Sequence, residues 1–210
     1  VVTIASAALA LFFGFLLSWL TGIFALAGLI LGVLYSHPRI SLKDRPWGGL
    51  VMNGIGHGAL IYLTGYSAAG VFHPSALYRM LPYAAAYAGV YVFTTIPDIS
   101  GDRATGKRTI AVAAGEKRAK TVGFILTALG AISGLAASEP ALFLTGLFGI
   151  PLYIYASRKG RDKLVMASAA SVFLLNLWIC FYIFAYAPLL LIVVVGSKLY
   201  FSQRLKTSYP

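Results

Sequence analysis

Long apolar stretches follow one another along almost the whole chain, and short polar segments separate them. A helix that crosses the hydrocarbon core of a bilayer needs about 20 predominantly apolar residues. By this criterion the sequence predicts eight membrane-spanning helices, at about 1–20, 21–36, 47–66, 78–97, 120–137, 140–157, 164–184 and 186–201. The last two belong to one apolar run that is too long for a single span, so we expect a tight turn around Tyr186-Ala187-Pro188.

Composition supports a membrane protein. Hydrophobic residues make up 59% of the 210 residues, charged residues 11%, and the mean hydropathy is +0.82. Soluble domains carry about 25% charged residues. We therefore predict an all-α, polytopic transmembrane helix bundle that forms a single domain over residues 1–210.

The net charge of +11 is unevenly distributed. Nearly all Lys and Arg residues fall in segments that alternation of the spans places on one side, namely 37–46, 98–119, 158–163 and 198–210. Such a bias marks the cytoplasmic side of a membrane protein. We therefore expect a multi-pass protein of the cytoplasmic membrane with the 98–109 loop on the cytoplasmic side, in contact with lipid, and no nucleic acid partner.

Two acidic side chains stand out in the loop that follows the fourth predicted span. Asp98 and Asp102 are two of only six acids in the chain. If the segment is helical they lie on one face, where like charges repel unless a cation binds between them. Mg²⁺ suits such oxygen ligands and commonly bridges carboxylates to substrate phosphates. The alternative is a solvated loop whose acids balance Arg103, Lys107 and Arg108.

The fourth predicted span carries tyrosines at every fourth position, Tyr83, Tyr87 and Tyr91. If the helix continues past Pro97, these rings share a sector with the two aspartates. Aromatic faces stabilise cations in dry surroundings, so this face would suit an allylic diphosphate whose tail lies among the rings. Plain packing or an interfacial aromatic belt is the alternative.

Polar residues elsewhere admit two readings each. Asn53 and His57 share a face of the third predicted span, and they form either part of a binding site or an interhelical hydrogen bond. Lys43 and Arg45 precede that span, and they either attract lipid headgroups or hold a substrate phosphate.

Two segments resemble a known family, the UbiA superfamily of intramembrane prenyltransferases. Its second aspartate-rich motif is similar to Asp98-Ile-Ser-Gly-Asp102-Arg103, followed by Gly106 and Thr109-Ile110. Its loop between the fourth and fifth helices is similar to Tyr35-Ser36-His37-Pro38-Arg39 with Leu42-Lys43. The resemblance covers essentially the whole chain.

The resemblance implies a helical bundle with a central cavity under cytoplasmic loops. It also implies Mg²⁺-assisted transfer of a prenyl group from an isoprenyl diphosphate to a lipophilic, often aromatic acceptor, as in quinone biosynthesis. Asp98 and Asp102 would hold Mg²⁺, while Lys43, Arg103 and Lys107 would neutralise the departing pyrophosphate. We further expect the prenyl and acceptor cavity to be lined by Tyr91, Tyr87, Asn53 and His57.

One departure from the family pattern concerns its first motif, of Asn-Asp-x-x-Asp type, which nothing in this sequence matches. Residue 1 is Val and already lies in an apolar stretch. We therefore expect the first two helices and that motif to be missing, so that the aspartate pair is half of a metal site.

Two other functions compete with this hypothesis. A transporter or channel could use Asn53, His57 and Asn176 to line its path, although no repeat symmetry or paired helix break supports it. A non-catalytic isoprenoid-binding membrane protein is the other. Pyrophosphate release from a prenyl diphosphate would distinguish the three.

Overall fold

The structure, a computed structural model, describes residues 2–205, and all regular elements in that range are helices, without strands. The long helices are α1 (Val2–Leu17), α2 (Trp19–Ser36), α5 (Ala76–Thr95), α8 (Glu116–Ala136), α9 (Pro140–Lys159), α10 (Asp162–Tyr182) and α11 (Tyr186–Tyr200). One more long helix consists of α3 (Pro46–Met52), the π-helix η2 (Asn53–Leu60) and α4 (Ile61–Ala68). The short elements are a 3-10 turn, η1 (Leu42–Asp44), then α6 (Ile99–Ala104), α7 (Ile110–Ala114) and a second π-helix, η3 (Phe201–Leu205).

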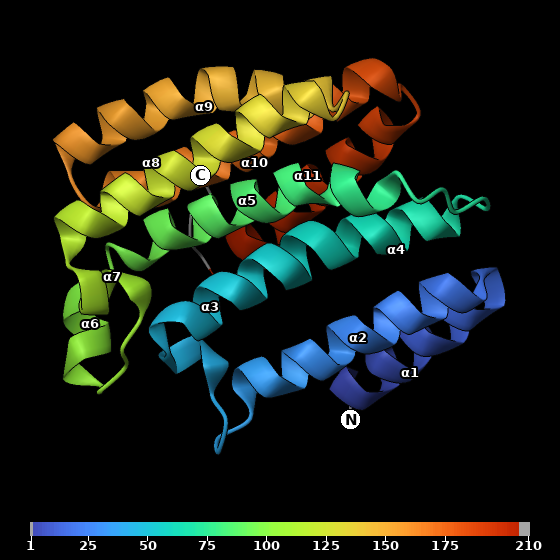
Figure 1. The fold of residues 1–210 in the computed structure, drawn as a ribbon, viewed down its shortest axis with the longest axis horizontal. Helices are drawn as coiled ribbons and strands as arrows, with labels where there is room; N and C mark the ends of the chain where they lie inside the picture. Colours follow the sequence, from blue (N-terminus) through green and yellow to red (C-terminus); the bar gives the residue numbers. More distant parts are fainter. Residues whose placement is uncertain (1, 206–210) are drawn as a thin grey trace.

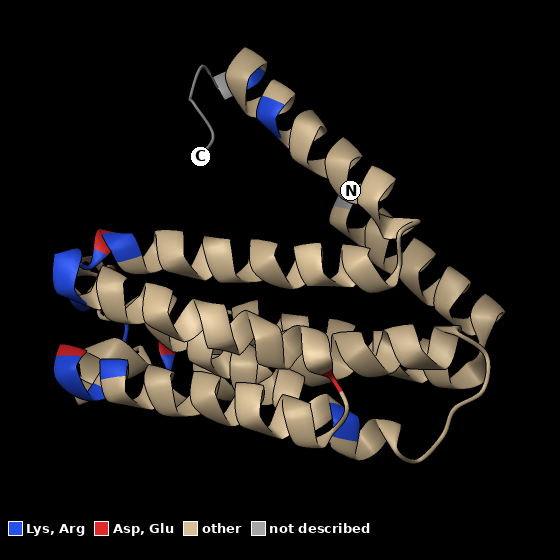
Figure 2. Cartoon of the chain, turned by 90° about the horizontal axis from the view of Figure 1, so that it is seen from above, with Lys and Arg blue, Asp and Glu red and all other residues tan. Residues whose placement is uncertain are grey.

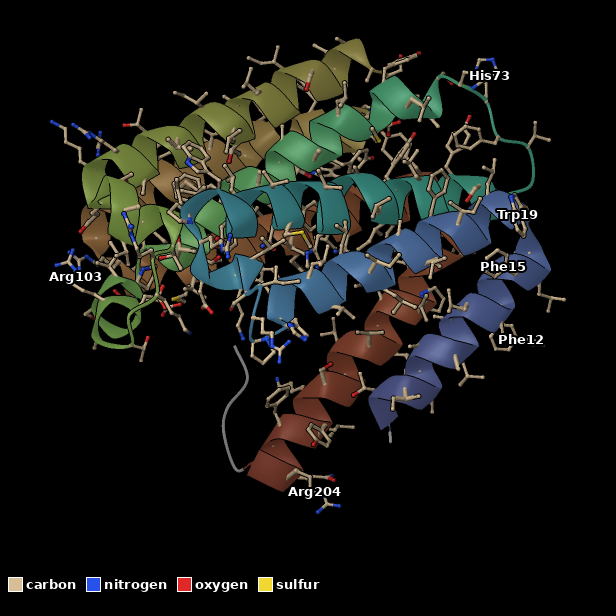
Figure 3. All side chains as sticks on the ribbon, turned by 60° about the horizontal axis from the view of Figure 1, so that its bottom comes forward. Phe12, Phe15, Trp19, His73, Arg103 and Arg204 are labelled. Atoms are coloured by element: carbon tan, nitrogen blue, oxygen red, sulfur yellow. The ribbon has the colours of Figure 1, made fainter. Side chains whose placement is uncertain are left out.

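The predicted membrane bundle is confirmed. Each of the eight predicted spans coincides with one long helix, and the ends differ by a few residues. Five of these helices, α2, α8, α9, α10 and α11 with part of η3, are long and apolar enough to cross a bilayer. The exposed side chains are also apolar, as expected where lipid replaces water: Phe12 is 61% exposed and Trp19 71% exposed. Both point outward from the bundle (Figure 3).

Helix α5 occupies the centre of the bundle (Figure 1). It packs chiefly against α8 on one side and against η2 on the other, while α9 and α10 complete the far side and α2 leads outward to α1. Small residues permit these close contacts. A Cβ atom added at Gly58 would lie 2.5 Å from the Cα of Ala84, and one added at Gly130 would lie 2.9 Å from the backbone nitrogen of Ala86.

Aromatic packing fills the core beside the α5–α8 contact. Phe93 is fully buried and stacks on Tyr153 of α9, with ring centroids 4.1 Å apart. Phe124 of α8 meets Phe93 edge-on at 5.1 Å. These rings tie the three helices together close to the end where the loops carry the acidic motif.

The tyrosines and the aspartates could share one face only if the fourth span continued as a helix past Pro97, and it does not. Helix α5 ends at Thr95, and Asp98 directly precedes a separate helix, α6, which runs in a different direction (Figure 1). Proline has no N–H to donate, so the Phe93 carbonyl loses its intrahelical partner there, although Ile96 keeps helical dihedrals (φ −67°, ψ −44°). The tyrosines and the aspartates are therefore positioned by two helices rather than one.

The last turn also lies earlier than expected. Residues 183–185 join α10 to α11, and Pro188 sits in the first turn of α11 instead of breaking the chain. Proline is tolerated there because the first N–H groups of a helix have no intrahelical partner. Helix α11 then diverges from the rest of the bundle (Figure 2).

The two ends of the bundle differ in charge. The α2–α3 loop, α6, α7 and the α9–α10 turn lie at one end, and most Lys and Arg residues gather there (Figures 1 and 2). At the opposite end Arg79 pairs with Glu139, with its Nε 3.0 Å from the carboxylate. Tyr83 donates to the same carboxylate at 2.9 Å, and Tyr62 does so at 3.3 Å. This cluster joins α4, α5 and the α8–α9 turn.

Candidate functional site

Two loops meet at the cation-rich end of the bundle. The backbone N–H of Arg108, between α6 and α7, donates to the carbonyl oxygen of Asp44 in η1 at 3.0 Å. The loop that resembles the family's fourth-to-fifth helix connection is therefore held directly against the loop that carries the aspartate motif. We call these two linked loops, residues 37–46 and 98–109, the roof of the bundle.

Asp102 lies at the inner edge of this roof. Its side chain is only 13% exposed, and its Oδ2 accepts a hydrogen bond from the Thr109 hydroxyl at 3.0 Å. The Lys107 ammonium lies 3.8 Å from its Oδ1. The backbone adds a further contact, because the N–H of Lys107 donates to the Asp102 carbonyl at 2.9 Å. Asp102 thus sits in an ordered turn with a cation beside it.

Asp98 is placed differently. It is exposed at the start of α6, one turn before Asp102, whose N–H donates to the Asp98 carbonyl at 2.8 Å. Within residues 2–205 its carboxylate has no hydrogen bond or ion pair. One acid of the pair is therefore fixed by neighbours, and the other is free to bind.

The turn carries the number of acids that Mg²⁺ needs. No group of three or more His, Cys, Asp or Glu side chains converges on a metal position in the described part of the chain. Mg²⁺, however, is usually held by one or two carboxylates together with substrate phosphates, and it retains several waters. The oxygens of Asp98 and Asp102 supply that number of ligands.

The three predicted phosphate-binding cations have different positions. Lys107 lies beside Asp102. Lys43 is exposed in η1, in the loop that Arg108 ties to the motif, and it has no acidic partner among the residues described. Arg103 points away from the helices into the surroundings (Figure 3). Lys107 and Lys43 are therefore better placed than Arg103 to meet an anion at the roof.

Asp44 belongs to the site's surroundings, and the sequence interpretation missed it. One of its carboxylate oxygens is buried without a partner in the described structure, and Ser41 donates to the other. Ser41 has a positive φ of 41°, a conformation that is uncommon outside glycine. The sequence shows Asp44 as an acid within a basic loop, but the hydrogen bond between its carbonyl and the Arg108 N–H depends on the fold.

Tyr91 is packed at the base of this roof rather than along an open channel. It is 9% exposed, and its hydroxyl has no hydrogen-bond partner within residues 2–205. That hydroxyl lies against Gly49 of α3, where an added Cβ would come within 1.9 Å of it.

Asn53 and His57 line one cavity. It lies between α2 and the α3–η2–α4 helix and has a volume of about 280 Å³. Tyr35 of the family-like loop segment lines the same cavity. The Asn53 amide donates to the Gly49 carbonyl at 2.9 Å, and His57 has no hydrogen-bond partner in the described range. The His57 ring is nearly parallel to that of Tyr87, with centroids 6.5 Å apart.

The structure is therefore that of a polytopic membrane helix bundle with two features: linked loops at one end that carry two aspartates and a neighbouring lysine, and a cavity with a few polar groups between α2 and the α3–η2–α4 helix. Residues 1–179 match the UbiA prenyltransferase family, and the chain belongs to that family.

Curated relatives support this membership. Chlorophyll synthase of Arabidopsis thaliana is 31% identical over 137 residues, which cover 62% of this chain and 35% of that protein. Digeranylgeranylglyceryl phosphate synthase of Halobacterium salinarum is 33% identical over 152 residues, or 70% of this chain and 48% of that protein. Lycopene elongase/hydratase of Haloarcula japonica is 33% identical over 122 residues, or 55% and 38%. The chain thus spans between about a third and a half of these relatives, and no solved structure matches it.

Proposed function

We propose that this protein is an intramembrane prenyltransferase that moves a prenyl group from an isoprenyl diphosphate to a lipophilic acceptor. The observation that carries the proposal is the Asp98–Asp102 turn, which lies at the cation-rich end of a bundle of this family with Lys107 beside it. Relatives named chlorophyll synthase and digeranylgeranylglyceryl phosphate synthase support the same reaction class.

In this proposal the carboxylates of Asp98 and Asp102 bind Mg²⁺ at the mouth of the bundle. When bound, the ion would offset the negative charge that develops on the departing pyrophosphate. Lys107 and Lys43 act on that same charge, which is greater in the transition state than in the bound substrate, and their stabilisation therefore accelerates the reaction. Thr109 keeps the Asp102 carboxylate in place through its hydrogen bond.

The cavity between α2 and η2 is our candidate for the acceptor side. Its apolar wall includes Leu31, Met52 and Ile61, and His57 and Asn53 supply the few polar groups that orient a ligand. The relatives' names indicate products of different chemistry, so they do not select one acceptor. A quinone-precursor-like aromatic acceptor fits a cavity that combines apolar walls with a histidine next to Tyr87.

The test is pyrophosphate release by the purified protein in lipid nanodiscs, with a prenyl diphosphate, Mg²⁺ and a panel of acceptors. We expect Asp98→Asn and Asp102→Asn to reduce turnover at least a hundredfold while the melting temperature stays close to that of the wild type. Asp162→Asn is the matched control, since Asp162 is a 74% exposed acid at the same end of the bundle, and among the described residues it pairs only with Lys163. Wild-type turnover in either motif variant would refute the assignment.

A further inference from the structure

A dense group of basic side chains lies where α8 begins and α9 ends. The two helix ends are adjacent, because the Lys120 ammonium donates to the Ser157 carbonyl at 3.2 Å. Arg161, in the α9–α10 turn, forms an ion pair with Glu116 at 2.6 Å. Segments 116–120 and 158–163 thus form one continuous surface at the cation-rich end.

This surface has a large excess of positive charge. Its two segments contain seven basic and two acidic side chains, which leaves a formal charge of +5. Both acids are already paired: Glu116 with Lys120 and Arg161, and Asp162 with Lys163. Four exposed cations have no acidic partner among the described residues, and we call them the basic patch: Lys117, Arg118, Arg158 and Lys159.

The helix dipole favours the positions of only two of the four cations in the basic patch. Arg158 and Lys159 lie in the last turn of α9, where the helix dipole favours cations. Lys117 and Arg118 lie in the first turn of α8, where the dipole disfavours them. An anion outside the chain would compensate for that unfavourable position.

The basic patch also lies at the level expected for lipid headgroups. The Lys159 ammonium lies 5.6 Å from the ring centroid of Tyr155, which is 63% exposed one turn earlier in α9. On α8 the next outward apolar side chain is Ile125, 53% exposed. Tyrosines and long cations at the ends of apolar helices are typical of the membrane–water interface.

We propose that the basic patch is a binding surface for the headgroups of anionic phospholipids. A phosphate could also come from the prenyl diphosphate substrate, which shares this chemistry. The position of the patch favours the lipid, because its neighbours are exposed apolar side chains on the perimeter of the bundle. The cavity with Asn53 and His57 is lined by α2 and the α3–η2–α4 helix, with no residue from α8, α9 or α10.

The experiment titrates the purified chain, in neutral detergent, with phosphatidylglycerol or phosphatidylcholine and counts bound lipids by native mass spectrometry. Two double variants divide the patch: Lys117→Gln with Arg118→Gln, and Arg158→Gln with Lys159→Gln. Each basic residue near a membrane surface contributes about a fivefold gain in affinity for anionic lipid, so each pair should lose about 25-fold for phosphatidylglycerol. Phosphatidylcholine binding should not change.

Lys198→Gln with Arg204→Gln is the matched control, since it removes the same charge from the end of another apolar helix. We expect it to lower phosphatidylglycerol affinity less than either patch pair does, because its two cations stand six residues apart on a helix that diverges from the bundle (Figure 2). The swap Arg158→Lys with Lys159→Arg keeps the charge, and we expect it to keep the affinity, which separates lipid binding from a folding defect.

Three results would overturn the proposal. Unchanged phosphatidylglycerol binding in both patch variants would show that the patch does not hold the lipid. An equal loss in the control pair would show that only net charge matters. Displacement of the lipid by millimolar inorganic pyrophosphate would assign the patch to a soluble or substrate phosphate instead.

Discussion

Replacement of Gly58 by alanine tests how closely η2 must approach α5. The new Cβ would lie 2.5 Å from the Cα of Ala84 and 2.6 Å from the carbonyl oxygen of Tyr83, both backbone atoms. Carbon atoms in contact lie about 3.5–4.0 Å apart, so the two helices would have to separate by roughly 1 Å. Overpacking of this kind costs about 1–3 kcal/mol.

For a chain of this length that cost corresponds to a fall in melting temperature of about 2–12 °C. The measurement is a thermal melt in detergent, in which the loss of the monodisperse peak in size-exclusion chromatography reports unfolding. Gly65→Ala is the matched control, because Gly65 lies in the same long helix with nothing within 4 Å of an added Cβ. The control should melt at or slightly above the wild-type temperature, since alanine is a better helix former than glycine. A Gly58→Ala protein as stable as the control would show that this contact does not limit packing.

Three further predictions concern the two ends of the bundle and the cavity. Glu139→Gln leaves Arg79, only 29% exposed, without its anionic partner, so we expect the free energy of unfolding to fall by about 1–3 kcal/mol, with allowance for that exposure. Turnover per folded molecule should change little, and an unchanged melting temperature would contradict this prediction. His57→Ala should raise the KM for the acceptor about fivefold in steady-state kinetics, because one hydrogen bond to the acceptor is lost, and it should leave the KM for the diphosphate unchanged. The reverse pattern would show that His57 contacts the prenyl substrate instead. Chelation with EDTA should stop pyrophosphate release and added Mg²⁺ should restore it, whereas turnover that persists in EDTA would exclude the proposed role of Asp98 and Asp102.

The membrane architecture could be predicted from the sequence because it depends on local composition. An apolar stretch long enough to cross a bilayer must satisfy its backbone hydrogen bonds within itself, so it becomes a helix whatever its neighbours are. Prolines were harder to interpret. Pro97 follows the end of α5, Pro188 lies in the first turn of α11, and Pro82 lies inside α5, so a proline alone does not decide where a helix ends.

The site was only partly predictable, because its contacts join distant segments. The i, i+4 spacing of the two aspartates was visible, but the exposure of Asp98 and the shielding of Asp102 by Thr109 depend on how α6 turns away from α5. The link between Arg108 and Asp44 spans more than sixty residues of sequence and leaves no local pattern. Outward-pointing Arg103 shows the same limit, since a basic residue next to a motif can face either way (Figure 3).

The η2 π-helix gives the chain one place where its length can change. Each of its hydrogen bonds spans one residue more than in the α-helices on either side. Deletion of one residue within 53–60 would let the segment close into an ordinary α-helix, and because the wider turn already holds the extra residue, the helix after it would keep nearly the same face. Tyr62 would therefore stay near Glu139, its partner across the bundle. A deletion within α4 has no extra residue to remove and would turn every later residue by about 100°. Loss of a single residue should therefore be tolerated in 53–60 far better than in α4.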